Sequence, residues 1–278
     1  MKFKIITGLL SCIFFMDGCT VPTPKTITVE STTVSTEQNP FYTESSLYMK
    51  YPDFDEIKNE NYTPAFVKGM ADHMAEIDAI AERADSPTLE NTIIAMEKSG
   101  ALLDRVATVF FALISANTND EMEKIRSEMA PKLSAHSDQI LLNGKLFHRV
   151  KTIYEQRDQL GLDAESKRLV EKYYTDFIRS GANLSNEEKE SLKKINGEIA
   201  VLQTTFSQNV LKEVNALAVV VDSKDELDCL SDAAIEAAAN EAKSRELDGK
   251  YVLTLRNTSG QPPMASLTNR ALRERIHK

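Results

Sequence analysis

Histidine and carboxylate side chains are the residues that could hold a catalytic metal, and histidines are scarce in this chain. None of them begins the His-Glu-x-x-His pattern, which places two zinc ligands and a general base on one helix. The four histidines are His73, His136, His148 and His277. The sequence also contains no Gly-rich phosphate loop, nucleophile elbow or Cys-x-x-Cys pair. The residue types therefore predict no catalytic and no metal-binding residue within this chain.

The densest group of potential ligands is Asp72, His73, Glu76 and Asp78. On a helix, Asp72 and Glu76 would face the same side, with His73 adjacent to them. A metal site needs ligands that converge on one point and a shell of hydrogen bonds that orients them. The pattern is therefore interpreted as a solvated acidic face beside a half-buried histidine, with a metal site as the alternative.

The composition of the 278 residues indicates an acidic, helical, globular protein. Hydrophobic residues make up 42% and charged residues 27%, which are ordinary values for a folded chain. Ten Gly and nine Pro are few, and because turn-rich β folds use these residues freely, their scarcity favours long helices. The net charge of −9 argues against binding to nucleic acid, which requires a positive surface.

The first 38 residues have the pattern of an export signal followed by a tether. Lys2 and Lys4 precede an apolar run too short to span a bilayer, so residues 1–19 are interpreted as a signal peptide. The sequence before Cys19 resembles a bacterial lipobox, which would make Cys19 a lipidation site; an ordinary cleaved signal is the alternative. Residues 20–38 form a polar Thr-, Ser- and Pro-rich linker, or else a short edge strand.

Apolar residues recur every three or four positions from residue 63 onwards, which predicts a series of helices. Thr63-Pro64 begins the first helix, and Ser185 with Glu188 forms a capping box at the start of a long one. The expected helices cover residues 63–81, 89–114, 119–143, 145–160, 164–179 and 185–213.

Strand-like sequences appear only in the last quarter of the chain. The apolar runs 216–221 and 251–255 predict two short strands on either side of an Ala-rich helix at 231–246. A final helix is expected from residue 267 to residue 278, without a residue that terminates it; a frayed natural end and a chain cut inside a larger protein are both open. Cys229, the lone cysteine of the exported form, is interpreted as a packing residue.

Four separated stretches, with Asn39-Pro-Phe41 before them, together resemble one known family. They are Phe54-Asp-Glu-Ile57 with Tyr62-Thr-Pro-Ala-Phe66; Pro87-Thr-Leu-Glu-Asn-Thr-Ile93 with Met96-Glu-Lys-Ser-Gly100 and Leu103-Asp-Arg-Val106; Phe110-Phe-Ala112 with Ala116-Asn-Thr-Asn-Asp120; and Leu142-Asn-Gly144 with Phe147, Gly161-Leu-Asp163 and Leu169-Val170. The chain is similar over residues 39–278 to the N-terminal region of the peptidyl-dipeptidases, within the thimet-oligopeptidase-like zinc metallopeptidases.

The resemblance implies a fold and an activity for a longer parent protein. It implies a mainly α-helical, channel-containing fold of the neurolysin and thimet-oligopeptidase type. The order of strand-like and helical runs adds to this a small α/β element near residues 216–255. The parent would bind zinc and release dipeptides from the C-termini of short, unfolded peptides. Its zinc ligands and catalytic Glu would lie in a C-terminal catalytic half, which this chain would contact and does not contain. A stand-alone periplasmic binding module and a structural lipoprotein are the alternatives.

The resemblance also implies where exposed apolar surface should lie. If residues 251–255 and the final helix pack against the missing half, their apolar side chains should be in water here. Region 216–278 is therefore expected to be less stable than region 63–213 and to favour self-association.

The signal and the linker place the folded part in the periplasm, with a possible anchor to the outer membrane through a lipidated Cys19. Changing Cys19 to Ala removes the thiol that would carry the lipid, so the variant should move from the membrane fraction to the soluble fraction while its circular dichroism stays the same. Cell fractionation followed by immunoblotting measures this. A wild-type chain that is already soluble would refute the lipid anchor.

Overall fold

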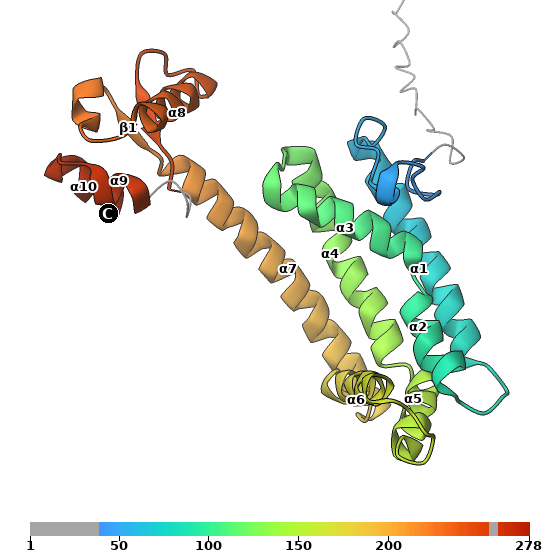
Figure 1. The fold of residues 1–278 in the computed structure, drawn as a ribbon. Coiled ribbons are helices and arrows are strands. Elements are labelled where there is room, and N and C mark those ends of the chain that lie inside the picture. The colour runs from blue at the N-terminus through green and yellow to red at the C-terminus, as the bar shows by residue number, and fades with distance from the viewer. Residues whose placement is uncertain (1–38, 256–260) are drawn as a thin grey trace, which may run out of the picture. The chain divides into compact units, whose positions relative to one another are not determined.

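The computed structural model describes residues 39–255 and 261–278 (Figure 1). The predicted signal peptide, Cys19 and the linker lie outside the described residues.

The described residues form a mainly α-helical fold with one small sheet, as the sequence predicted. The helices are α1 (Asn59–Ala81), α2 (Ala95–Lys98), α3 (Ala101–Ala116), α4 (Asp120–Leu141), α5 (Gly144–Gln156), α6 (Ala164–Arg179), α7 (Asn186–Ala216), α8 (Asp232–Ser244), α9 (Gln261–Ser266) and α10 (Arg270–His277). A 3-10 turn covers Tyr48–Lys50, a π-helical turn covers Leu89–Ile94, and a second 3-10 turn covers Lys224–Leu227. Strands β1 (Val219–Val221) and β2 (Tyr251–Leu253) pair antiparallel, with Val220 opposite Val252.

Local capping signals located several helix ends correctly. The Ser185 hydroxyl accepts from the Glu188 N–H at 3.3 Å, and the Glu188 carboxylate accepts from the Ser185 N–H at 2.9 Å. Asn119 caps α4 by accepting from the Met122 N–H at 3.0 Å. Asn143, expected to close the preceding helix, instead caps the start of α5.

Two helix predictions near the N-terminus are wrong. α1 begins at Asn59, not at Thr63-Pro64, because the Asn61 side chain closes an earlier turn by accepting from the Lys58 N–H at 2.7 Å; Pro64 therefore lies inside the helix. The single helix expected over 89–114 is broken at Ser99 and Gly100, where Gly100 has a φ of 75°. The break separates a π-helical turn and α2 from α3.

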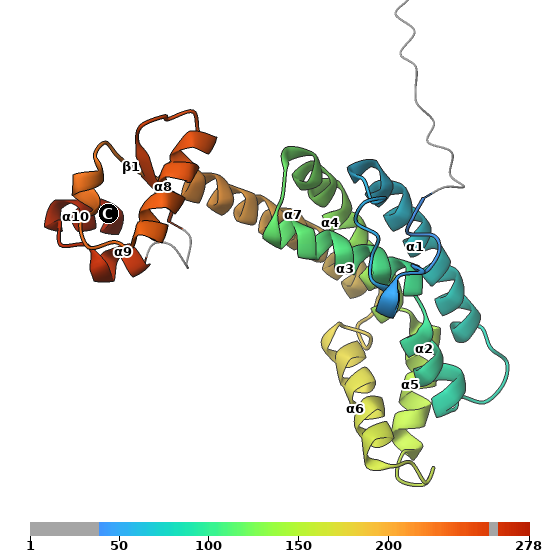
Figure 2. The ribbon, with the colours of Figure 1, turned by 45° about the horizontal axis from the view of Figure 1, so that its top comes forward.

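Helix α1 supplies residues to two separate hydrophobic cores. Its N-terminal half packs with α3 and α4 in an aromatic core, where the Tyr62 and Phe66 rings lie 5.0 and 5.3 Å from the Phe110 ring. Its C-terminal half, including Ile77, packs in a second core that is built largely from α5 and α6 and includes Phe177. Figures 1 and 2 both show α1 beside α3 and α5 beside α6.

The backbone of α1 comes unusually close to α3 at Gly69. A Cβ atom at this position would lie 2.9 Å from the Leu103 Cα and 3.0 Å from the Leu103 nitrogen. Both contacts are to backbone atoms, which cannot move without shifting α3. Gly69 is therefore required for this helix crossing.

One stretch, Leu89–Ala116, is long and apolar enough by composition to cross a membrane. In the described structure it is interrupted at Ser99 and Gly100, and it provides Ile93 to the second core and Phe110 to the aromatic core.

The C-terminal module, residues 217–255 and 261–278, has a core of its own. Val221, Leu253 and Leu272 are buried in it together. The expectation that the strand and the final helix would leave apolar side chains in water is therefore wrong, because these side chains pack against each other and against α8. Cys229, expected to be a packing residue, is exposed and has a positive φ of 70°.

Replacing Gly69 with Ala tests the close helix crossing. Ala favours a helix by about 1 kcal/mol over Gly, but the clash with the Leu103 backbone should reverse this gain and lower the free energy of unfolding by about 1–2 kcal/mol net. The matched control is Gly197→Ala in α7, where a Cβ would meet no atom within 4 Å; it should stabilise the protein by roughly 0.5–1 kcal/mol. Urea denaturation measures both, and a stabilising Gly69→Ala would contradict the assignment.

Candidate functional site

Two histidines that are distant in the sequence meet between α1 and α4. His73 Nδ1 lies 3.0 Å from His136 Nε2, and His73 Nε2 lies 3.1 Å from the Ser99 hydroxyl. The Ser99 hydroxyl donates to the Met96 carbonyl at 2.7 Å, so it accepts from His73 Nε2–H. His73 Nδ1 is then the acceptor for His136 Nε2–H, and the two rings form a hydrogen-bonded pair of neutral imidazoles.

The neighbouring acidic residues do not complete a metal site around this pair. The Glu76 carboxylate accepts from the Gly100 N–H at 2.7 Å, and Asp72 forms an ion pair with Lys68 at 2.8 Å. Within residues 39–255 and 261–278, no three His, Cys, Asp or Glu side chains come together in a way that could hold a metal ion. The described residues therefore do not fit a zinc ion.

Burial shifts the titration of both histidines in the same direction. It lowers the pKa of His73 from 6.5, although the nearby Glu76 charge partly opposes the shift. Burial also lowers the pKa of His136, and the neighbouring His73 adds to the effect. The fold thus favours the neutral forms, as the hydrogen-bonded pair requires.

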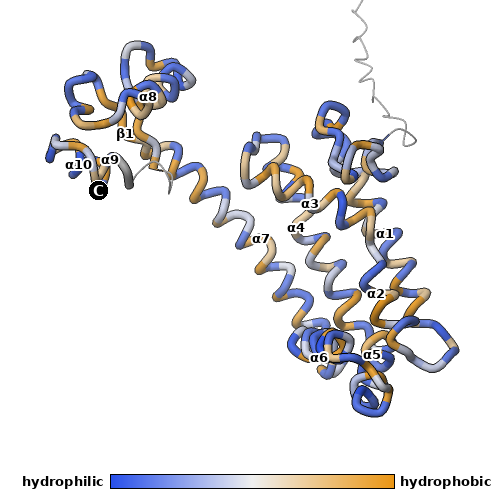
Figure 3. Tube along the Cα trace, in the orientation of Figure 1, coloured by the Kyte–Doolittle hydropathy of each residue, from blue (hydrophilic) through white to orange (hydrophobic). Residues whose placement is uncertain are grey.

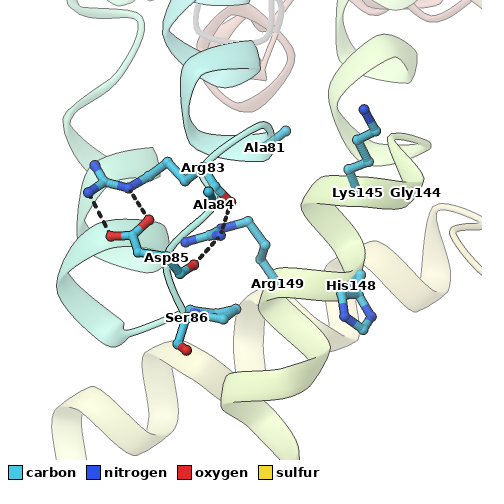
Figure 4. A pocket seen from close by; sticks show the side chains of 10 residues that line it. Ala81, Arg83, Ala84, Asp85, Ser86, Gly144, Lys145, His148 and Arg149 are labelled. Atoms are coloured by element: carbon cyan, nitrogen blue, oxygen red, sulfur yellow. Dashed lines mark hydrogen bonds and ion pairs between the residues drawn. The ribbon is translucent and has the colours of Figure 1, made fainter.

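A surface hollow of about 450 Å³ lies where the segment after α1 meets the start of α5 (Figure 4). At its base the buried Arg149 guanidinium donates to the carbonyls of Arg83 and Asp85, both at 3.0 Å. It also donates to Asn91 Oδ1 at 2.9 Å and Thr92 Oγ1 at 3.2 Å. Arg149 therefore fastens the connection between α1 and the π-helical turn onto α5.

The other cations that line the hollow are also paired. Arg83 binds Asp85 at 2.8 Å, and this hydrogen-bonded pair lowers the pKa of Asp85 to about 2. Lys145 contacts the Glu82 carboxylate at 2.6 Å. Because the arginine and lysine side chains already have protein partners, the hollow has the character of a structural junction and not of an anion site.

The structure therefore brings together residues that the sequence treated separately. Of the predicted ligand group, His73 and Glu76 hold the turn at Ser99 and Gly100, whereas Asp72 pairs within its own helix. His148 lines the hollow and His277 lies at the end of α10. The His73–His136 contact joins residues 63 positions apart, and no spacing in the sequence could reveal it. The prediction that this chain has no catalytic residue stays a prediction.

Comparison with known proteins shows that the chain is similar to a class of proteins named as peptidases. The chain is 41% identical over 241 residues to "Dipeptidyl carboxypeptidase" of Escherichia coli (strain K12), which covers 87% of this chain and 35% of that protein. It is 40% identical to "Dipeptidyl carboxypeptidase" of Salmonella typhimurium, over 86% of this chain and 35% of the relative. "Oligopeptidase A" of Salmonella typhimurium is 26% identical over the same shares of the two chains. No family model matches the chain.

Within this class the chain is homologous to the dipeptidyl carboxypeptidases, and the resemblance predicted from the four stretches is confirmed. The chain spans about a third of the length of the curated relatives that it matches.

The histidine pair makes stability depend on pH. Folding lowers the pKa of both histidines below 6.5, the ordinary pKa of histidine in an unfolded chain. The stabilisation from the neutral pair is therefore fully present above pH 6.5, and it is lost as the pH falls through the lower pKa values of the folded state. The free energy of unfolding should therefore decrease between pH 7 and 5.5. Urea titrations at several pH values measure the slope, which should flatten in His136→Gln and persist in the exposed control His148→Gln. An equal slope in both variants would contradict a role for the pair.

Proposed function

We propose that this chain is the N-terminal, non-catalytic portion of an exported zinc metallopeptidase that releases dipeptides from the C-termini of short peptides. The observation that carries the proposal is the 41% identity over 241 residues to a dipeptidyl carboxypeptidase. The chain spans 35% of that relative, and its described residues include no group of ligands that fits a metal. The catalytic chemistry is therefore assigned to the part of the peptidase that corresponds to the remaining two thirds of that relative.

The described residues would act as a rigid support for the catalytic part. Two cores share α1, the Gly69 crossing fixes α3, and Arg149 fastens the connecting segment to α5. A rigid wall of this kind can restrict access to a site and so favour short, unfolded peptides over folded proteins. In this proposal the helices hold the catalytic part in position and keep folded proteins out, and they transfer no proton to the substrate.

The proposed location is the periplasm. The support is the sequence of residues 1–38, with Lys2 and Lys4 before an apolar run, the lipobox-like Cys19 and the polar linker.

The proposal is tested with the chain alone and with a chimera. The purified 278-residue chain should leave a peptide with a free C-terminus intact, with or without added zinc. A chimera, in which residues 39–278 replace the matched segment of the Escherichia coli dipeptidyl carboxypeptidase, should release dipeptides and stop when a chelator is added. Mass spectrometry of the products measures this.

The controls are the unaltered Escherichia coli enzyme and the same enzyme without the matched segment. Chelator-sensitive dipeptide release by the 278-residue chain itself would overturn the assignment of the chemistry. A folded but inactive chimera would favour a stand-alone helical binding module.

A further inference from the structure

The long helix α7 has two faces of opposite character. The face toward α4 makes polar contacts: Asn196 donates to the Asp138 carboxylate at 2.7 Å, and Gln208 donates to the Ser127 hydroxyl at 2.9 Å. Thr204, which also lies on this face, is the one buried residue of α7. Polar contacts thus hold α7 against the described helices.

The other face carries large apolar side chains that the described residues do not cover. Leu202 is 66% exposed, Phe206 is 70% exposed and Ile195 is 51% exposed. Ile199 and Val210 are exposed on the same side, and the hydropathy colouring of Figure 3 shows orange positions recurring along α7. These five residues, Ile195, Ile199, Leu202, Phe206 and Val210, are called the α7 apolar face.

The spacing of the α7 apolar face indicates what kind of element fits it. At 100° per residue the five side chains fall within about 80° of the helix circumference, whereas Thr204 lies about 180° from Ile195. The steps from Ile195 to Phe206 are four, three and four residues, which is the spacing of the buried seam in paired helices. This spacing gives α7 a straight apolar stripe of the kind along which a second helix packs.

The flanks of the α7 apolar face suggest recognition by packing and not by charge. Gln203, Thr205 and Asn209 border it and are uncharged, and Glu198 is the charged neighbour on one side. Because the side chains of the α7 apolar face lie in water, they contribute little burial of apolar surface to the stability of the described fold. The face requires an apolar partner.

We propose that the α7 apolar face is the docking surface for a helix of the peptidase portion that this chain does not cover. The relatives are nearly three times as long as the matched region, so about two thirds of each relative has no counterpart in this chain. The C-terminal module cannot be the occupant, because its apolar side chains already fill its own core. This inference rests on the proposed function and identifies the contact through which the two portions join.

The test uses Leu202→Glu/Phe206→Glu, with Gln203→Glu/Thr205→Glu as the matched control. Both pairs add two carboxylates to exposed positions of the same helix, and only the first pair lies on the α7 apolar face. In the 278-residue chain neither pair should change the unfolding midpoint, because all four side chains are exposed. In the active chimera the first pair should lower dipeptide release by roughly tenfold or more, while the control stays within about twofold.

Each outcome of this experiment decides the inference. An unaltered chimera without activity refutes the proposed function, whereas an active chimera that tolerates Leu202→Glu/Phe206→Glu overturns only the docking surface. A 278-residue chain that forms dimers, which the same pair dissociates, would make a second copy the occupant. If the Glu pair unfolds the chain alone, Leu202→Gln/Phe206→Gln is measured in the chimera in its place, with the same two decisive results.

Discussion

The approach of α1 to α3 at Gly69 is the constraint on which the helical part depends. A side chain there would meet the Leu103 backbone, so the two helices can cross at this distance only while residue 69 has no Cβ. The crossing places Tyr62 and Phe66 beside Phe110 on one side of Gly69. On the other side, α1 continues into the second core. One glycine therefore lets a single helix serve two cores.

The stretches that carry the family resemblance prove to be structural contacts. Asn91 accepts from Arg149 at 2.9 Å and donates to the Ser86 carbonyl at 2.9 Å, so it holds the segment before it against α5. Gly100 has a positive φ, and a Cβ there would lie 2.9 Å from the His73 ring. These two residues of the matching stretches thus fix how the helices pack.

Local signals predicted the fold well, and long-range contacts account for the errors. The Ser185–Glu188 box and the Asn119 cap act within three residues, so the sequence located the starts of α7 and α4. The break at Ser99 and Gly100 interrupts a continuous apolar pattern because contacts from α1 hold the turn. The burial of Arg149 had no sequence signal either, since its partners are 57 to 66 residues away.

The same reasoning explains why the sequence predicted that α7 is a helix but not that its apolar side chains are exposed. Its apolar period indicates a helix whatever covers the stripe, and such a stripe ordinarily faces the core. Here Asn196 and Gln208 occupy the side that packs on α4. With both helical cores and the C-terminal module closed without it, the apolar stripe contributes little to the stability of the described chain. The proposed docking would give these large side chains a contact that the described fold does not supply.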